Sequence, residues 1–298
     1  MSTFTPAETT EAITTSGGAR PRSAQKRGRS VRFHVLLIVA ALTWLLPMIW
    51  MLSMALTPNT VLQSSSSNLL PQAITFENFL TVLQGSDMPR WFLNSAVVSI
   101  LTTAVTVIFC AMAGYAFARI AFPGRRIVFV IVLAGLMVPK EAMFIPLFLM
   151  ISSADLQNSY AALILPRLAA PLGVFLMTQF FSKVPPEMEE AARIDGAGRW
   201  RTFFSVMLPL ARPAMASLAI FTFVLTWNDY LWPLVASTRT EWFTITTGLA
   251  SLQSNFASAT NLGDLMARGL IGSLPLIIVF IVFQKQLIRG ITLGSGEK

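Results

Sequence analysis

Four consecutive residues in the second half of the chain combine aromatic rings with polar side chains, in the order Trp227, Asn228, Asp229 and Tyr230. They lie inside an otherwise apolar stretch that runs from 213 to 234. Aromatic faces pack against the C–H faces of sugars, while amide and carboxylate groups hydrogen-bond to hydroxyls. The segment is therefore a candidate substrate pathway for a carbohydrate. A polar contact that locks two helices together explains the same residues equally well.

Three further ionisable residues, Lys140, Glu141 and Arg167, interrupt apolar stretches. Lys140 and Glu141 are adjacent, so on a helix they would point about 100° apart and could not simply pair with each other. They are candidates for a gate near the outer end of a membrane segment, but anchoring to neighbouring helices or lipid headgroups is the favoured explanation. Arg167 has the same two explanations, a pathway contact or a structural contact, and the structural one is favoured.

Several kinds of chemistry are excluded by what the chain lacks. It has one histidine, His34, and one cysteine, Cys110, which rules out a His-rich metal site and an internal disulfide. No glycine is followed by lysine, so the phosphate-binding loop of many nucleotide-binding proteins is absent. We expect no enzyme activity and no bound metal or cofactor, with any ATP and Mg²⁺ held by another chain. Cys110 is expected to be a small packing residue.

The composition requires elements suited to a membrane. Of the 298 residues, 54% are hydrophobic and 12% charged, whereas soluble domains carry about a quarter charged residues. Six apolar segments are close to the roughly 20 residues that cross a bilayer as a helix, namely 35–56, 94–117, 127–151, 160–181, 213–234 and 270–287. The predicted fold is all-α, a polytopic membrane protein with six transmembrane helices. Prolines allow the third and fourth to be broken or tilted.

The basic residues indicate the orientation. Most of the 22 Lys and Arg residues lie before the first segment, after the last one, or in the loops that would share that side. Cytoplasmic loops are enriched in Lys and Arg, so both termini are expected in the cytoplasm of a multi-pass inner-membrane or plasma-membrane protein. The net charge of +8 then reflects topology and contact with anionic lipid rather than binding to nucleic acid.

Three domain regions are expected. Residues 1–33 are polar and then basic, which is typical of a disordered cytoplasmic N-terminus, and they lack the features of a cleavable signal peptide. Residues 34–290 form the membrane domain, and 291–298 form a cytoplasmic tail.

The loop between the fourth and fifth segments, 184–213, reads VPPEMEEAARIDGAGRWRTFFSVMLPLARP. Acidic residues in the first turn favour a short helix that ends near Asp195. Gly196 would allow a sharp turn because glycine tolerates positive φ. A second helix would run over 199–208, ended by Pro209. The loop is thus predicted to form a helix–turn–helix elbow, and a surface helix in the lipid interface is the alternative.

The spacing within this elbow resembles the EAA loop of ABC-importer permeases, whose pattern is E-A-A-x3-G-x9-I-x-L-P. The matching residues are Glu190, Ala191, Ala192, Gly196, Val206, Leu208 and Pro209, with valine at the isoleucine position. The resemblance implies that this loop 184–213 contacts the importer's ATPase. The residues implied to couple to it are Glu190, Ala191, Ala192, Asp195, Gly196, Leu208 and Pro209.

Other segments resemble the maltose-type branch of carbohydrate-uptake importers, so that the likeness covers roughly 35–298. These segments are Asn94–Ser95, Gly114–Arg119, Trp227–Leu231 and the ending Gln284–Gly290. The resemblance implies the type I ABC-importer permease fold and carbohydrate uptake by alternating access. It also implies three partners: a second six-span permease subunit, a homodimeric cytoplasmic ATPase and an extracytoplasmic solute-binding protein.

Two alternatives remain open. The same assembly could carry glycerol phosphate or another polar solute. A secondary transporter that works without an ATPase belongs to a different class, but it should show repeats in two halves. No such repeat is evident in the sequence, and that alternative leaves the EAA spacing unexplained.

Overall fold

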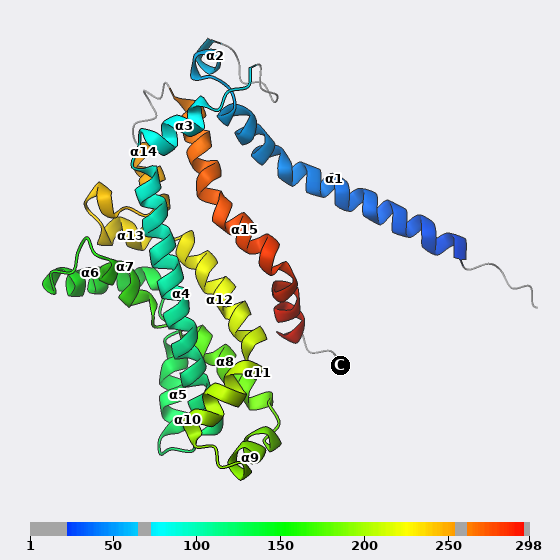
Figure 1. Ribbon diagram of the computed structural model, residues 1–298, viewed down its shortest axis with the longest axis vertical. Coiled ribbons are helices and arrows are strands. Elements are labelled where there is room, and N and C mark those ends of the chain that lie inside the picture. The colour runs from blue at the N-terminus through cyan, green and yellow to red at the C-terminus, as the bar shows by residue number, and fades with distance from the viewer. Residues whose placement is uncertain (1–22, 65–72, 254–260, 295–298) are drawn as a thin grey trace, which may run out of the picture. The chain divides into compact units, whose positions relative to one another are not determined.

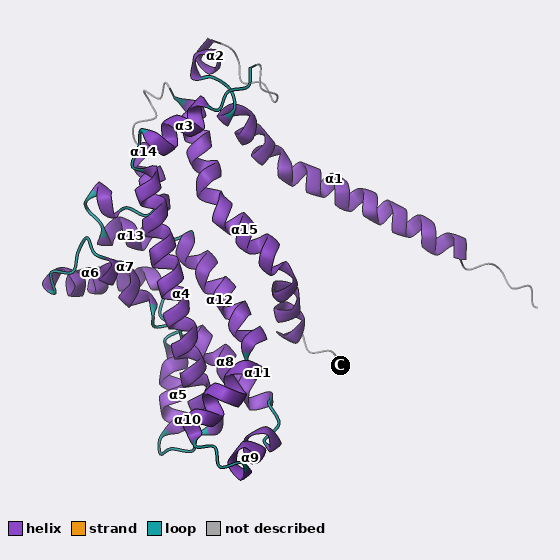
Figure 2. Ribbon diagram, in the orientation of Figure 1, coloured by secondary structure: helices purple, strands orange, loops and turns teal. Residues whose placement is uncertain are grey.

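The computed structural model describes residues 23–64, 73–253 and 261–294, and every element in these ranges is a helix (Figure 2). The termini 1–22 and 295–298, which hold most of the expected N-terminal tail and part of the C-terminal one, lie outside the described residues. The chain forms two compact units, 1–50 and 51–298. Helix α1, Ser23–Ala55, contributes to both units, and the functional features below lie in the second.

The second unit is organised around α4, Met88–Arg119, which packs against α8, Pro171–Lys183, and α12, Arg212–Trp227. Gly114 permits the closest approach, because a methyl group there would lie 2.5 Å from Met177 Cβ. Cys110 is buried in the same contact, which confirms its expected packing role.

The described residues contain fewer unbroken membrane-spanning helices than the six segments predicted from the sequence. Among the described residues, three helices are long and apolar enough to cross a membrane, at 33–55, 88–119 and 262–284. Two bent pairs pass the same test together, one with a bend of 48° at 168–170 and one with a bend of 74° at Ala211. The described chain therefore has three to five candidate spans, and the count of six is not confirmed.

The third predicted segment, 127–151, is where the count differs. It forms α5, Arg125–Ala134, then a 3₁₀ turn η1, Lys140–Met143, and α6, Phe144–Ser153. Pro139 stands at this break and has no backbone N–H to continue a helix. The break that its prolines allowed is thus present, and the segment forms two short helices instead of one span.

The remaining elements complete the bundle (Figure 1). They are α2 Asn59–Ser64, α3 Glu77–Gln84, α7 Tyr160–Ile164, η2 Leu165–Arg167, α9 Glu187–Ile194, α10 Arg199–Thr202, η3 Phe203–Met207, α11 Leu208–Leu210, α13 Leu231–Ala236, η4 Thr240–Trp242, α14 Ile245–Gln253 and α15 Leu262–Gly294. Large apolar side chains point outward from several helices, including Phe109, Ile131 and Phe280, which are 54%, 65% and 60% exposed. Such extensive exposed apolar surface is typical of a protein that contacts lipid or partner subunits.

Candidate functional site

The predicted elbow is present at the end of α4 that carries Arg119 (Figure 1). Helix α9 ends at Ile194 and is followed by Gly196, whose φ of 76° is the left-handed conformation expected for this turn. The second helix begins at Arg199 but continues past Pro209 to Leu210, so the expectation that Pro209 ends it is wrong. The helix widens into a π turn, Phe203–Met207, just before the proline. A widened turn accommodates the ring and the missing N–H of Pro209.

The two faces of α9 differ in burial. Glu189 and Ala192 face inward and are 6% exposed, whereas Glu190, Ala191 and Asp195 are exposed. A hollow of about 320 Å³ lies between α9 and the second helix, and it is lined by Met188, Ala191, Ala192, Asp195, Ala197, Arg201, Ser205 and Val206. The structure thus brings three predicted coupling residues together at this hollow. Of the others, Glu190 lies outside it, Gly196 forms the turn, and Leu208 and Pro209 are half-buried in the second helix.

Arg119, the last residue of α4, fastens the elbow to two helices. Its Nε donates to the Phe181 carbonyl at 3.0 Å, and its Nη2 donates to the Val184 carbonyl. The same guanidinium faces Glu189 of α9, with Nε 3.5 Å from Oε1. Arg193 approaches the other carboxylate oxygen of Glu189 at 3.8 Å. No local pattern in the sequence indicates this contact, since Arg119 and Glu189 are 70 residues apart.

Aromatic packing reinforces the same junction. The Tyr115 ring lies 5.7 Å from the Phe181 ring and 5.1 Å from the Phe203 ring, measured between centroids. These three residues belong to α4, α8 and η3, so the end of α4, the end of α8 and the second helix of the elbow form one packed cluster. A displacement of the elbow would therefore be transmitted to both long helices.

The polar residues inside the apolar stretches form an ion pair between distant parts of the chain. Arg167, in η2, pairs with Asp229, which follows α12. The Asp229 side chain also accepts from the Leu231 N–H at 3.1 Å, and its carbonyl accepts from Thr246 Oγ1 at 2.6 Å. Both partners stand where a helix is interrupted, so the pair joins two breaks in the apolar stretches.

The other residues of that candidate pathway have different surroundings. Trp227 is buried, its Nε1 donates to the Gly272 carbonyl at 3.0 Å, and its ring stacks on Phe223. Asn228 and Tyr230 are exposed. Lys140 and Glu141 are also exposed, in η1, and neither is in an ion pair within the described part of the chain.

At the opposite end of α4, Asn94 and Ser95 hold a distant loop in place. The Asn94 amide donates to the carbonyls of Glu241 and Phe243 at 2.9 and 3.0 Å, and Ser95 Oγ accepts from the Ile245 N–H at 2.8 Å. The segment around η4 and the start of α14 is thereby fixed to the first turns of α4. The sequence analysis noted this Asn-Ser pair only as part of a resemblance.

Comparison with known proteins gives consistent results. Residues 107–293 match the family described as "Binding-protein-dependent transport system inner membrane component". The chain is 34% identical over 279 residues to the diacetylchitobiose uptake system permease protein of Streptomyces coelicolor, covering 93% of this chain and 92% of that protein. It is 32% identical over 272 residues to the sn-glycerol-3-phosphate transport system permease protein of Pectobacterium atrosepticum, covering 89% of this chain and 97% of that protein.

The fold also has a counterpart among solved structures. A crystal structure of a bacterial ABC transporter involved in the import of the acidic polysaccharide alginate contains a chain that matches 90% of this chain and 99% of its own length. The TM-score is 0.77 and the sequence identity is 24%. The two chains share a fold.

Proposed function

This chain belongs to the family of binding-protein-dependent transport system inner membrane components, and from this premise we propose that it is a permease subunit of an ABC importer that takes up a carbohydrate. The observation that carries the proposal is the elbow, because it joins an exposed hollow to α4 and α8 through Arg119. One side of the elbow is exposed, and the other is joined to the long helices α4 and α8. This arrangement suits an element that passes the motion of a partner subunit to the membrane helices.

In this proposal the elbow contacts a cytoplasmic ATPase dimer, which holds the ATP and Mg²⁺. Glu190, exposed beside the hollow, pairs with a basic group of the ATPase, and the small residues Ala191 and Ala192 allow close approach. ATP-driven closure of the ATPase moves the elbow, and the spans follow between inward-open and outward-open states. A second permease subunit and an extracytoplasmic binding protein complete the assembly, with six spans and both termini of this chain in the cytoplasm.

For the pathway, we propose that the Arg167–Asp229 pair is a lock between interrupted helices and that Asn228 and Tyr230 face the cargo. Trp227 then supports them from the core. Removal of one partner of a largely buried ion pair is costly, because it leaves the other charge without compensation.

A neutral sugar suits this arrangement better than an anion, because Asp229 already neutralises the charge of Arg167. One relative is a permease for diacetylchitobiose, which supports the carbohydrate. Another is a permease for sn-glycerol-3-phosphate, so this polar solute remains the second candidate cargo.

The test is ATP hydrolysis and uptake by the reconstituted importer with its binding protein, given diacetylchitobiose, other oligosaccharides or glycerol-3-phosphate. We expect one sugar to stimulate hydrolysis in the wild type. The variants Gly196→Asp and Glu190→Lys should assemble but lose coupled uptake, because the first adds a charged side chain at the exposed turn and the second reverses a charge on the exposed face of the elbow. Glu187→Lys is the matched control, since Glu187 carries the same charge and is exposed on the same helix but lies outside the EAA spacing.

Other results would overturn the proposal. If both elbow variants transport normally, the elbow is not the ATPase contact. If the chain transports without any ATPase, it is a secondary transporter. Stimulation by glycerol-3-phosphate alone would replace the carbohydrate with the phosphate ester.

A further inference from the structure

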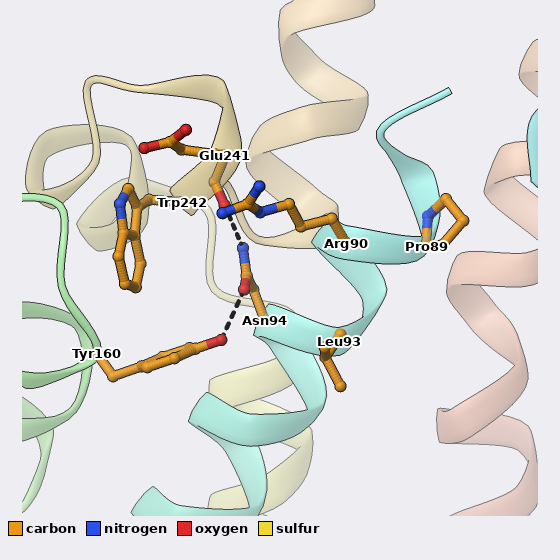
Figure 3. A pocket seen from close by; sticks show the side chains of 7 residues that line it. All are labelled: Pro89, Arg90, Leu93, Asn94, Tyr160, Glu241 and Trp242. Atoms are coloured by element: carbon orange, nitrogen blue, oxygen red, sulfur yellow. Dashed lines mark hydrogen bonds between the residues drawn. The ribbon is translucent and has the colours of Figure 1, made fainter. Parts of the chain in front are cut away.

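A second hollow lies at the end of α4 away from the elbow, and we refer to it as the outer pocket (Figure 3). It has a volume of about 490 Å³ and is lined by Pro89, Arg90, Leu93, Asn94, Tyr160, Glu241 and Trp242. These residues come from the first turns of α4, the start of α7 and η4. At about 1.5 Å of rise per residue, α4 carries Asn94 about 37 Å away from Arg119.

The walls of the outer pocket are held by hydrogen bonds. Asn94 uses both amide hydrogens on the carbonyls of Glu241 and Phe243, and its oxygen accepts from the Tyr160 hydroxyl at 2.9 Å. The Tyr160 and Trp242 rings meet edge to face, with centroids 5.1 Å apart and an interplanar angle of 78°. The aromatic wall is therefore formed before any ligand arrives, which lowers the entropy cost of binding.

Two charged groups at the rim remain available. Within the described residues Arg90 has no ion-pair partner, and Glu241 has only a 3.8 Å contact with Arg239, in which both side chains are exposed. An exposed pair of this kind is weak. A guanidinium offers several N–H donors and a carboxylate offers acceptors, and the hydroxyls of a sugar can use both.

We propose that the outer pocket binds one sugar unit of a neutral carbohydrate at the extracytoplasmic entrance. This inference rests on the proposed function and places a cargo contact in this subunit. The ring would pack on Trp242 and Tyr160, while Arg90 and Glu241 bond to hydroxyls. The lining carries one positive side chain, Arg90, and one negative one, Glu241, and this balance suits a neutral ligand. The volume lies within the roughly 300–1,000 Å³ of small-molecule sites.

The test uses the single cysteine of the chain. In a Cys110→Ala background, a new cysteine is placed either in the pocket as Leu93→Cys or beside it as Arg239→Cys, a residue that is exposed but does not line the pocket. The assembled importer, in nanodiscs and without its binding protein, is labelled with a hydrophilic maleimide, with and without diacetylchitobiose and other neutral oligosaccharides. We expect the sugar that supports uptake to slow labelling of Leu93→Cys at least threefold and to leave Arg239→Cys unchanged.

A second pair of variants tests the aromatic wall. Added to the Leu93→Cys variant, Trp242→Ala should abolish the protection by sugar, whereas Trp242→Phe should keep most of it. Loss of protection in Trp242→Ala but not in Trp242→Phe would show that the sugar stacks on an aromatic ring. Equal loss in both variants would indicate a general change in the loop.

Three results separate this inference from the proposed function. If sugar drives uptake but protects neither cysteine, the outer pocket is not a sugar site and the importer assignment stands. If the ligand-free binding protein slows labelling while sugar alone does not, the pocket is a protein contact and the inference is wrong. If no sugar stimulates uptake or hydrolysis in the wild type, the proposed carbohydrate function fails. The labelling rate of Leu93→Cys with and without sugar then still decides whether the outer pocket binds sugar.

Discussion

The two ends of α4 are fastened in chemically different ways. At the outer end, neutral groups of Asn94 and Ser95 make direct hydrogen bonds of 2.8–3.0 Å to the loop that carries η4. At the elbow end, Arg119 makes hydrogen bonds to α8 but meets Glu189 of α9 at 3.5 Å, beyond the roughly 2.7–2.9 Å of a direct charge-assisted bond. The Glu189 oxygen Oε1 is buried and has no hydrogen-bond partner among the residues that the structure describes.

This difference predicts that the contact of Asn94 and Ser95 with the η4 loop is rigid and that the contact of Arg119 with Glu189 can change in length. A set of satisfied neutral hydrogen bonds has one good geometry, so the outer loop is fixed. An ion pair without a direct hydrogen bond keeps much of its attraction over a range of distances, because the Coulomb energy changes gradually with separation. The contact between Arg119 and α9 can therefore change in length without being lost, while the packing of Tyr115 on Phe203 holds the second helix of the elbow against α4.

The largest effect should come from the charged end. Arg119→Ala leaves Glu189 buried without its main partner, and such a loss costs about 3–5 kcal/mol. We expect coupled uptake to fall more than tenfold, and Arg119→Lys to lie between, because lysine keeps the charge but not the forked geometry. The measurement is sugar uptake per ATP hydrolysed in proteoliposomes. Arg126→Ala, at an exposed position in the first turn of α5, is the control and should transport normally; equal loss in both variants would contradict the assigned role.

The neutral end should give a smaller and more local effect. Asn94→Leu removes the donors to two carbonyls and the acceptor for Tyr160, at a cost of about 1–3 kcal/mol for unsatisfied buried groups. Amide hydrogen exchange over 240–247 should quicken, while exchange at the elbow stays the same. Asn228→Leu provides the comparison, because in the described part of the chain the Asn228 amide donates to Val224, in the last turn of the helix that it follows. Faster exchange at the elbow would show that the two ends are not independent.

The close contact of α4 with α8 lies at Gly114, between the two ends of α4, and can be tested there. Alanine there would place a methyl group 2.5 Å from Met177 Cβ and 2.8 Å from backbone atoms, so α4 and α8 must separate. Overpacking of this kind costs about 1–3 kcal/mol, and the thermal unfolding midpoint in detergent should fall. Gly269→Ala should change it little, because that methyl group would meet only the flexible end of Met51 at 3.2 Å. An unchanged midpoint for Gly114→Ala would disprove the close contact.

The smallest effect is expected in the turn of the elbow. Gly196 has a φ of 76°, so alanine there costs about 1–2 kcal/mol of backbone strain. Gly198 is the matched control, since its φ is −69° and neither glycine has a heavy atom within 4 Å of an added methyl group. We expect Gly196→Ala to lower coupling a few-fold and Gly198→Ala to leave it unchanged. A similar loss in both variants would rule out the turn conformation as the cause.

Local sequence patterns were sufficient for the features that depend on neighbouring residues. The helix that ends before Asp195 and the glycine turn after it follow from spacing within a few residues, and both are present. Length and hydropathy located the long helices. Prolines predicted that the third segment could break, and it does break beside Pro139, but the path of the chain after the break depends on packing with other helices and has no local signal.

Contacts between distant residues were beyond such patterns. No local signal pairs Arg167 with Asp229 or Arg119 with Glu189. One sign was available within α9, however. Glu189 and Ala192 are three residues apart and so share one helical face, and the structure buries that face instead of the one that carries Glu190. Helical periodicity would have separated an inward glutamate from an outward one.

The tight contact at Gly114 divides α4 into two arms of unequal length. The arm toward Arg119 is about 7.5 Å long and the arm toward Asn94 about 30 Å, at the helical rise per residue. If the rigid helix tilts about this contact, a stroke of about 1 Å at the elbow becomes about 4 Å at the outer pocket. In such a lever the displacement is larger and the force smaller at the outer pocket than at the elbow. A short, strong movement at the elbow thus becomes a long, weak one at the outer pocket.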